Sequence, residues 1–243
     1  MSNINQDFEK WALGFSGMDG GDIGAPSSQA IWVSGIEWGG GHSASSLLEE
    51  FNKNVSSPPD GYNDWAHNLK FKYNQQKMKL LSAVQGGIVA DYKVFAETKR
   101  PFCVGSQGYF KTNLYPVGFR NVNHHHWLDS IAQVTGIETK QGYMDWCRIH
   151  RFPKLRSYAA KAKPRLIICA GVTFADDFKR AYAEVNSEFK LELIDGQPLR
   201  WLWNEDDTLV VVIPFMTSPR GLKRNITIQA FGERIRELLL DER

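Results

Sequence analysis

The sequence predicts an α/β protein with three α/β/α layers around a central, mostly parallel four-stranded sheet. Short apolar runs typical of buried strands occur at residues 30–35, 108–113 and 164–171, and a strand, a polar turn and a strongly apolar strand follow within 200–215. Stretches with helical periodicity separate these runs. Strands that alternate with helices in this way pair mainly in parallel and are covered by helices on both faces.

Local signals along the chain predict the helices. Residues 4–14 are weakly helical and precede a Gly/Ser-rich stretch, so residues 1–29 are expected to form an N-terminal helix and loop of a single domain spanning 1–243. A serine cap opens a helix over 43–54. Further helices are expected at residues 74–85, 126–134, 143–149, 174–185 and 226–240.

The composition of the 243 residues, 42% hydrophobic and 23% charged, is that of an ordinary globular chain. No run approaches the roughly 18 consecutive apolar residues of a membrane helix, and the first residues lack the pattern of a signal peptide. Cys103, Cys147 and Cys169 are too few for a four-thiolate cluster and have no CxxC spacing, which favours a reducing, cytoplasmic location. We expect no cofactor, no metal and no membrane partner.

The net charge is only +2, but the basic residues are unevenly distributed. Residues 148–165 contain seven Lys or Arg and no Asp or Glu, and a second cluster consists of Arg220, Lys223 and Arg224. Such segregation can build a basic face that meets phosphates. Solvated loops and helix faces without a partner explain the charges equally well.

Ligands of such sheets bind at the carboxyl ends of the strands. Four segments follow the expected strands and are therefore the places for a site. They are residues 35–42, 113–119, 171–174 and 214–225.

Glu37 lies at the end of the first strand, among Gly35, Gly39, Gly40 and Gly41. The missing side chains let a ligand approach the backbone closely. A carboxylate here can orient a water molecule or face a developing positive charge, or it can simply cap the following helix. The segment lacks the lysine and spacing of a P-loop.

Two further segments carry polar groups that could meet a ligand. Asn113 ends the second strand, and its amide offers the donor and acceptor that suit the edge of a nucleobase, although asparagine also favours turns. Adjacent side chains such as those of His124, His125 and His126 rarely converge on one ion, so we expect a loop cluster that lines a site or contacts phosphate.

Together these segments resemble the uracil-DNA glycosylase superfamily, and most closely its mismatch-specific thymine/uracil branch. Residues 35–39, GIEWG, stand where the family has GQDPY or GINPG, and FKTN places Asn113 where the family's base-reading Asn lies. The strand PRLIICAG resembles the third family strand, and VVVIPFMTSPRGLKRN resembles the last strand with its DNA-inserting loop. Glu37 replaces an Asp or Asn of the family, and residues 216–219, MTSP, replace the usual HPSP and lack its His.

The resemblance implies a uracil-DNA glycosylase-like fold and a DNA glycosylase that flips out a pyrimidine and hydrolyses its N-glycosidic bond. Glu37 is then the catalytic residue. The implied base-binding residues are Gly35, Ile36, Trp38, Gly39, His42 and Asn113, and the implied DNA-binding residues are Ser218, Arg220, Leu222, Lys223 and Arg224, with Leu222 as the wedge that fills the vacated stack.

The resemblance also bears on the choice of base. Gly39 stands where the strictly uracil-specific branch has a Tyr that walls off C5 of the pyrimidine. Without that Tyr there is room for a substituent on C5, which favours a C5-substituted base such as the glucosylated hydroxymethylcytosine of phage DNA. Trp38, His42 or the run of histidines could contact the substituent. The expected partner is double- or single-stranded DNA.

Two alternatives remain open at the level of sequence. One is a catalytically inactive glycosylase fold that binds DNA or a protein, which the replaced first motif and the missing His both favour. The other is a hydrolase of free nucleosides or nucleotides, for which the basic segments would be unnecessary.

Overall fold

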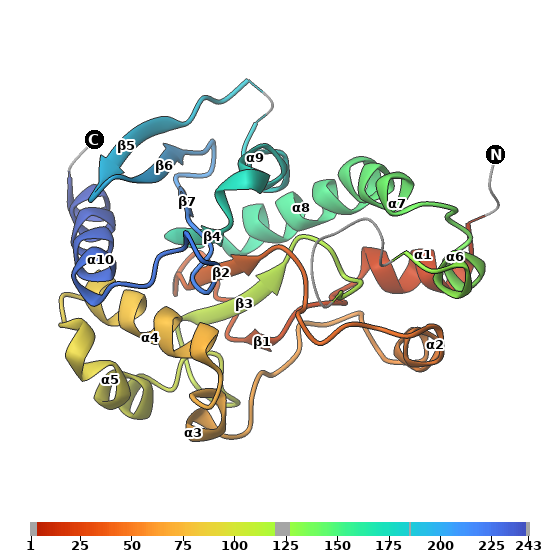
Figure 1. Ribbon diagram of the computed structural model, residues 1–243, viewed down its shortest axis with the longest axis horizontal. Coiled ribbons are helices and arrows are strands. Elements are labelled where there is room, and N and C mark those ends of the chain that lie inside the picture. Colours follow the sequence, from red (N-terminus) through yellow and green to blue (C-terminus); the bar gives the residue numbers. More distant parts are fainter. Residues whose placement is uncertain (1–3, 120–126, 185, 242–243) are drawn as a thin grey trace.

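A seven-stranded mixed sheet forms the centre of the protein, for which the computed structural model describes residues 4–119, 127–184 and 186–241 (Figure 1). The order of the strands across the sheet is β1-β3-β2-β4-β7-β6-β5. Their bounds are β1 Gly20–Gly21, β2 Ile31–Gly35, β3 Tyr109–Asn113, β4 Leu166–Ala170, β5 Lys190–Ile194, β6 Gln197–Trp203 and β7 Leu209–Ile213.

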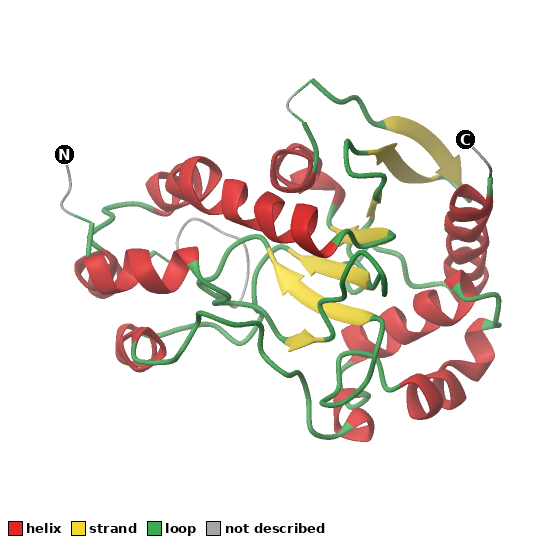
Figure 2. Ribbon diagram, turned by 180° about the vertical axis from the view of Figure 1, so that it is seen from behind, coloured by secondary structure: helices red, strands yellow, loops and turns green. Residues whose placement is uncertain are grey.

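Four adjacent strands, β3, β2, β4 and β7, pair in parallel, and the outer strands β1, β6 and β5 pair antiparallel. The α/β class is thus confirmed, but the sheet has seven strands instead of the expected four. Strand β6 corresponds to the strand expected at the start of residues 200–215, so the strands that were not expected are β1 and β5, and β5 pairs with β6 in a hairpin at the edge of the sheet (Figure 2). Asp195 and Gly196 connect its strands, both with positive φ, which matches the twist of a tight hairpin.

Helices cover both faces of the sheet. One apolar cluster joins one face to α4, α5 and α10, and the other cluster joins the opposite face to α1, α7, α8 and α9. The helix bounds are α1 Gln6–Leu13, α2 Ala44–Phe51, α3 Trp65–Asn68, α4 Lys72–Val84, α5 Tyr92–Lys99, α6 Asp129–Thr135, α7 Lys140–Trp146, α8 Phe152–Ala162, α9 Ala175–Tyr182 and α10 Asn225–Leu240. Single helical turns occupy Val89–Asp91, Cys147–Arg151 and Val172–Phe174.

Most expected helices are present, with ends that shift by a few residues. The serine cap is confirmed, since the Ser43 side chain accepts a hydrogen bond from the Ser46 backbone N–H at 3.1 Å. The basic run was not expected to be helical, yet its centre forms α8. Among the described residues, no helix combines the length and apolar character needed to cross a membrane.

The central strands β4 and β7 are buried along their whole length, because helices cover both of their faces. Side chains alternate between the two core clusters along each strand, so Trp32 and Phe110 face one layer while Ile31 and Tyr109 face the other. Both cores are therefore built on the same strands. Packing on both faces fixes the positions of the carboxyl ends of these strands relative to one another.

The packing of α10 on α4 predicts a stability effect at Gly232. A Cβ atom there would lie 2.3 Å from the Cβ of Ala83, much closer than real carbon contacts. We expect Gly232→Ala to lower the free energy of unfolding by about 1–3 kcal/mol because of overpacking. This loss should exceed the gain of ~1 kcal/mol that alanine brings in a helix.

Urea denaturation of the single variants and of the double variant G232A/A83G measures this effect. Shortening Ala83 makes room for the new methyl group, so the double variant should be more stable than the sum of the two single effects. A Gly232→Ala variant as stable as the parent protein would show that the two helices are not packed this closely.

Candidate active site

The carboxyl ends of the four parallel strands meet at one edge of the sheet. Gly35 of β2 pairs with Asn113 of β3, and Ala170 of β4 pairs with Ile213 of β7. The segments that follow these strands therefore start at the same level, as the sequence predicted. This edge brings Glu37, Asn113 and the loop after β7 to one end of the molecule.

The loop after β2 is interleaved with the loop after β3. Leu114 and Tyr115 donate backbone hydrogen bonds to the carbonyls of Gly35 and Ile36, at 3.0 and 2.9 Å. Further along, the His42 backbone N–H donates to the Gly118 carbonyl at 2.8 Å, and the Gly118 N–H donates to Nδ1 of His42 at 2.8 Å. The two loops thus hold each other on both sides of Glu37.

Glu37 is buried beside a lysine that the sequence analysis did not identify. The exposed fraction of its side chain is only 7%, and its Oε2 lies 3.7 Å from Nζ of Lys140, the first residue of α7. The Lys140 ammonium also lies 3.9 Å from the centre of the Phe119 ring. Within the described residues, the buried Oε1 of Glu37 has no hydrogen-bond partner. That oxygen can accept a hydrogen bond only from a water molecule or a ligand that reaches it inside the protein.

Burial shifts the pKa of both groups toward their neutral forms. It raises the pKa of Glu37 from 4.5 to about 7, although Lys140 opposes the rise. It also lowers the pKa of Lys140, which the negative charge of Glu37 opposes. A carboxyl with a pKa near 7 exchanges a proton readily at neutral pH, as a general base or acid must.

Asn113 lies directly against Gly35. A Cβ atom on Gly35 would be 2.3 Å from Oδ1 of Asn113, so a side chain at this position would displace the Asn113 amide. The Asn113 amide nitrogen donates a hydrogen bond to the Gly17 carbonyl at 2.7 Å. The amide is thus at the expected end of the strands, where one of its two N–H groups is engaged with the chain, which leaves the other N–H and Oδ1 for a base.

Two hollows border the Gly-rich loop, and His42 lines both of them. One cavity of about 170 Å³ is lined by Trp11, Gly17, Met18, Asp19, Trp38, His42 and Glu50. The other, of about 430 Å³, is lined by Gly40, Gly41, His42, Ser43, Ser46, Phe119, Leu128 and Ile131. Trp38 is 46% exposed, with its ring centre 5.2 Å from that of His42. A Cβ atom on Gly39 would meet nothing within 4 Å.

Ile36 has a different role from the one expected. Its side chain is buried in the core and packs toward Gly171, where an added Cβ atom would lie 2.7 Å from Cδ1 of Ile36. The side chain therefore anchors the loop after β2 to the end of β4. It does not face a ligand.

The structure contradicts the interpretation of Leu222 as a wedge that enters DNA. Leu222 is fully buried in the core cluster under α4 and α10, and its backbone N–H donates to the Phe215 carbonyl at 3.2 Å. Inserting it into a base stack would first remove it from the core. The position of Leu222 in the linear motif gave no information about burial. Its neighbours Arg220, Lys223 and Arg224 are exposed, and Arg224 pairs with Asp195 at 3.1 Å.

The basic run at residues 148–165 does not form one phosphate-binding face. Arg148 pairs with Asp177 and Asp145, at 2.7 Å in each case. Arg151 is buried and donates to the carbonyls of Leu114 and Ser16, at 2.8 and 2.7 Å. These arginines hold loops together, so the first two basic residues of the run are structural.

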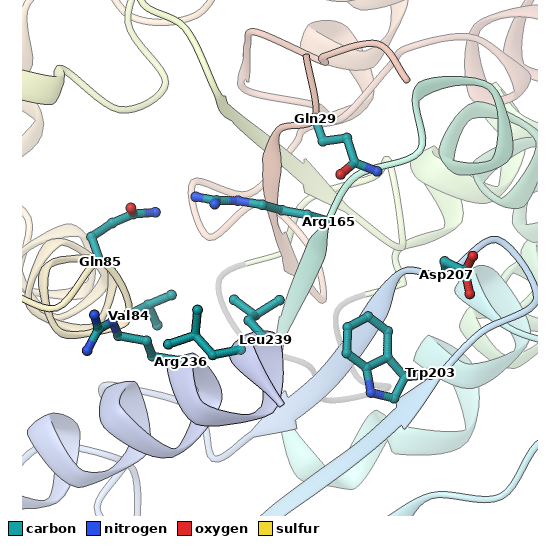
Figure 3. Close-up of a pocket in the computed structure, with 9 residues that line it drawn as sticks. Gln29, Val84, Gln85, Arg165, Trp203, Asp207, Arg236 and Leu239 are labelled. Atoms are coloured by element: carbon teal, nitrogen blue, oxygen red, sulfur yellow. The ribbon is translucent and has the colours of Figure 1, made fainter. Parts of the chain in front are cut away.

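The last residue of that run, Arg165, directly precedes β4, and Figure 3 shows its side chain among the residues that line a pocket. Arg165 lines this pocket of about 520 Å³ together with residues from the segments before β2 and β7, from the end of β6 and from the C-terminal parts of α4 and α10. The other lining residues are Gln29, Val84, Gln85, Trp203, Asp207, Arg236, Leu239 and Leu240. Because Gln29 precedes β2 and Arg165 precedes β4, this pocket is at the amino ends of the parallel strands, away from Glu37.

His124, His125 and His126 lie outside the described residues. In the part of the chain that the structure describes, no three His, Cys, Asp or Glu side chains are grouped as metal ligands. Cys103, Cys147 and Cys169 are buried and free.

Comparisons with known proteins give no further indication of identity: no family model and no curated protein matches this chain.

The buried pair predicts how stability depends on pH. Because the folded-state pKa of Glu37 is above its usual value, its carboxyl stabilises the fold fully below about pH 4.5, and this contribution is lost as pH rises through 7. The loss amounts to about 3 kcal/mol. Relative to Glu37→Gln, the natural protein should therefore become progressively less stable between pH 5 and pH 8.

Chemical denaturation of both proteins across this range tests the prediction. Lys140→Met is the matched variant, because removing the ammonium should move the transition of Glu37 to higher pH. If the natural protein and Glu37→Gln keep a constant difference in stability over the range, Glu37 does not titrate there.

Proposed function

We propose that this protein is a DNA glycosylase that hydrolyses the N-glycosidic bond of a C5-substituted pyrimidine, with a uracil-DNA glycosylase-like fold. The observation that carries the proposal is the buried carboxyl of Glu37, which has an oxygen without a partner among the described residues and a pKa raised to about 7. It lies at the carboxyl edge of the parallel strands, where ligands of α/β sheets bind. The two hollows that border the Gly-rich loop offer room for an extruded base, although Glu37 itself lines neither of them.

The reaction needs a group that assists water at the sugar. A water oxygen forms a bond to C1′, the C1′–N bond breaks, and its electrons leave with the base, which takes up a proton. Ionised Glu37 orients the water through Oε1 and accepts the proton that the water loses. Lys140 keeps part of the Glu37 population ionised at neutral pH, because its charge opposes the rise in the Glu37 pKa.

The same carboxylate stabilises positive charge on the sugar as the bond breaks. At ~4 Å and an effective dielectric constant near 20, two opposite charges attract by roughly 4 kcal/mol. That energy corresponds to about a thousandfold in rate. Glu37 is buried, so this attraction is less screened than at the surface.

His42 can hydrogen-bond the base. Its Nδ1 accepts the hydrogen bond from Gly118, so the ring proton is assigned to Nε2. Burial lowers the pKa of His42, which keeps the ring neutral. A neutral ring with Nε2–H donates to a carbonyl oxygen of a pyrimidine, while the exposed Trp38 beside it offers a ring face.

We predict that the protein creates abasic sites in DNA that contains C5-substituted pyrimidines and that Glu37→Gln lowers this rate by about a thousandfold. The rate of the natural protein should rise with pH through about 7, since the ionised carboxylate is the active form. Alkaline treatment of a panel of modified oligonucleotides detects the abasic sites as strand breaks. Mass spectrometry of the released base identifies the substrate.

The space at Gly39 predicts the selectivity. No atom lies within 4 Å of a Cβ placed there, so a tyrosine can be accommodated without a clash at the backbone. Gly39→Tyr should slow release of a C5-substituted base by at least tenfold and leave release of an unsubstituted pyrimidine less affected. Gly39→Ala is the control, since one methyl group fills little of the opening. Unchanged activity of Gly39→Tyr on C5-substituted DNA would refute the role of this opening.

A binding module without catalysis is the second candidate. It is favoured by two contacts that engage part of the key groups, since Lys140 lies beside Oε2 of Glu37 and one N–H of the Asn113 amide donates to Gly17. Retained DNA binding with no abasic sites on any modified substrate would support this candidate. Cleavage of free nucleosides alone would instead indicate a small-molecule hydrolase.

A further inference from the structure

Two segments of the chain that are far apart in the sequence and lack acidic residues pack against each other. Residues 65–79 and 214–225 contain no Asp or Glu. The Tyr73 and Phe215 rings stack with their centres 5.1 Å apart, and the Gln76 amide donates to the Lys223 carbonyl at 3.1 Å. Nζ of Lys79 donates to Oδ1 of Asn225 at 2.9 Å. We call the exposed part of these two segments the basic aromatic surface.

The cations of this surface come from both segments. Its basic side chains are those of Lys70, Lys72, Lys79, Arg220, Lys223 and Arg224. The charges of α4 are close enough to interact, because Lys72 adds to the effect of burial in lowering the pKa of Lys79. Among the described residues, the only ion pair made by these side chains is that of Arg224 with Asp195. The surface therefore presents a concentration of positive charge to solvent.

Aromatic rings lie among these cations. Phe71 is 58% exposed and Phe215 is 37% exposed. Phe215 is supported from behind by the stacked Tyr73 ring, and His67 meets Phe71 edge-on with ring centres 6.2 Å apart. Exposed rings are costly in water, whereas a nucleobase stacked on one gains about 1–3 kcal/mol. Only unpaired bases offer free faces for stacking.

The surface lies at the same edge of the sheet as Glu37. Phe215 follows β7 by two residues, so it is at the carboxyl end of a parallel strand. The end of α4, at Val84, lines the pocket at the amino edge, so α4 runs back along the sheet and its first residues are toward the carboxyl edge. A strand held on this surface can continue toward the loop that carries Glu37.

We propose that the basic aromatic surface binds a single-stranded stretch of DNA, with Phe215 stacking on an unpaired base and Lys70, Lys72, Arg220 and Lys223 holding the phosphates. Phe215 thereby takes the place of the buried Leu222 as the residue of this loop that meets bases. The choice of DNA as the ligand rests on the proposed function, but the binding itself requires no catalysis.

The test measures binding of an unmodified, fluorescently labelled, mixed-sequence single-stranded oligonucleotide by anisotropy at several salt concentrations. Phe215→Ala should weaken binding about tenfold, which is the loss of one stacked base. Phe215→Trp should retain binding, and Phe215→Leu, which keeps apolar bulk in the loop, should weaken it as alanine does. Lys72→Glu and Lys223→Glu should each weaken binding and reduce the slope of affinity against salt.

Lys161→Glu is the matched charge control, because Lys161 is exposed on α8 in the other basic segment. It should leave binding nearly unchanged. A loss of affinity in Lys161→Glu equal to that in Lys72→Glu, full affinity in Phe215→Ala, or tighter binding of the matching duplex than of the single strand would each overturn the proposal. Because the oligonucleotide carries no modified base, these results do not depend on whether the glycosylase activity exists.

Discussion

The site depends on one buried interaction, the pair formed by Glu37 at the end of β2 and Lys140 at the start of α7. A lone charge at either position would carry a large desolvation cost, and the opposite charge reduces it. The helix that brings Lys140 is itself fixed, because the Tyr143 hydroxyl in α7 accepts a hydrogen bond from the Val117 N–H at 2.9 Å. The loops after β2 and β3 and the helix α7 thus hold the carboxyl in one place. A carboxyl held in this way keeps an unsatisfied oxygen and a pKa near neutrality, two properties that a surface glutamate lacks.

Much of the fold could be predicted because the central strands are buried on both faces and so appear as continuous apolar runs. Strand β5 could not be found by that criterion, since its residues are exposed or half-buried at the edge of the sheet. The pair Asp195-Gly196 that follows β5 is typical of a tight hairpin turn and could have indicated this strand. Helix α8 was hidden for another reason. Its sequence is rich in lysine and arginine, whose long side chains mask an apolar face formed by Phe152, Leu155 and Ala159.

Only the part of the candidate site that follows from the order of strands and loops could be predicted. Parallel strands must end at a common edge, so Glu37 and Asn113 could be placed together from their positions after strands. Lys140 could not be predicted, because its contact with Glu37 is made by tertiary packing between elements distant in the chain. The interpretation of Leu222 as a wedge was wrong, because a linear motif contains no information about burial. A charge count likewise left the role of the basic run open, because it does not show which arginines are buried or paired. The contact between α4 and the loop after β7 also joins distant segments, and the sequence alone identified only the loop half of that surface.

The central claim is that Glu37 titrates near neutral pH in the folded protein. Infrared difference spectroscopy of the natural protein against Glu37→Gln measures this directly, because a protonated carboxyl has a C=O stretch separate from that of a carboxylate. We expect a single carboxylic acid signal, absent from Glu37→Gln, that disappears with a midpoint near pH 7 and shifts to higher pH in Lys140→Met. A spectrum in which Glu37 is fully ionised at pH 5.5 would contradict the claim.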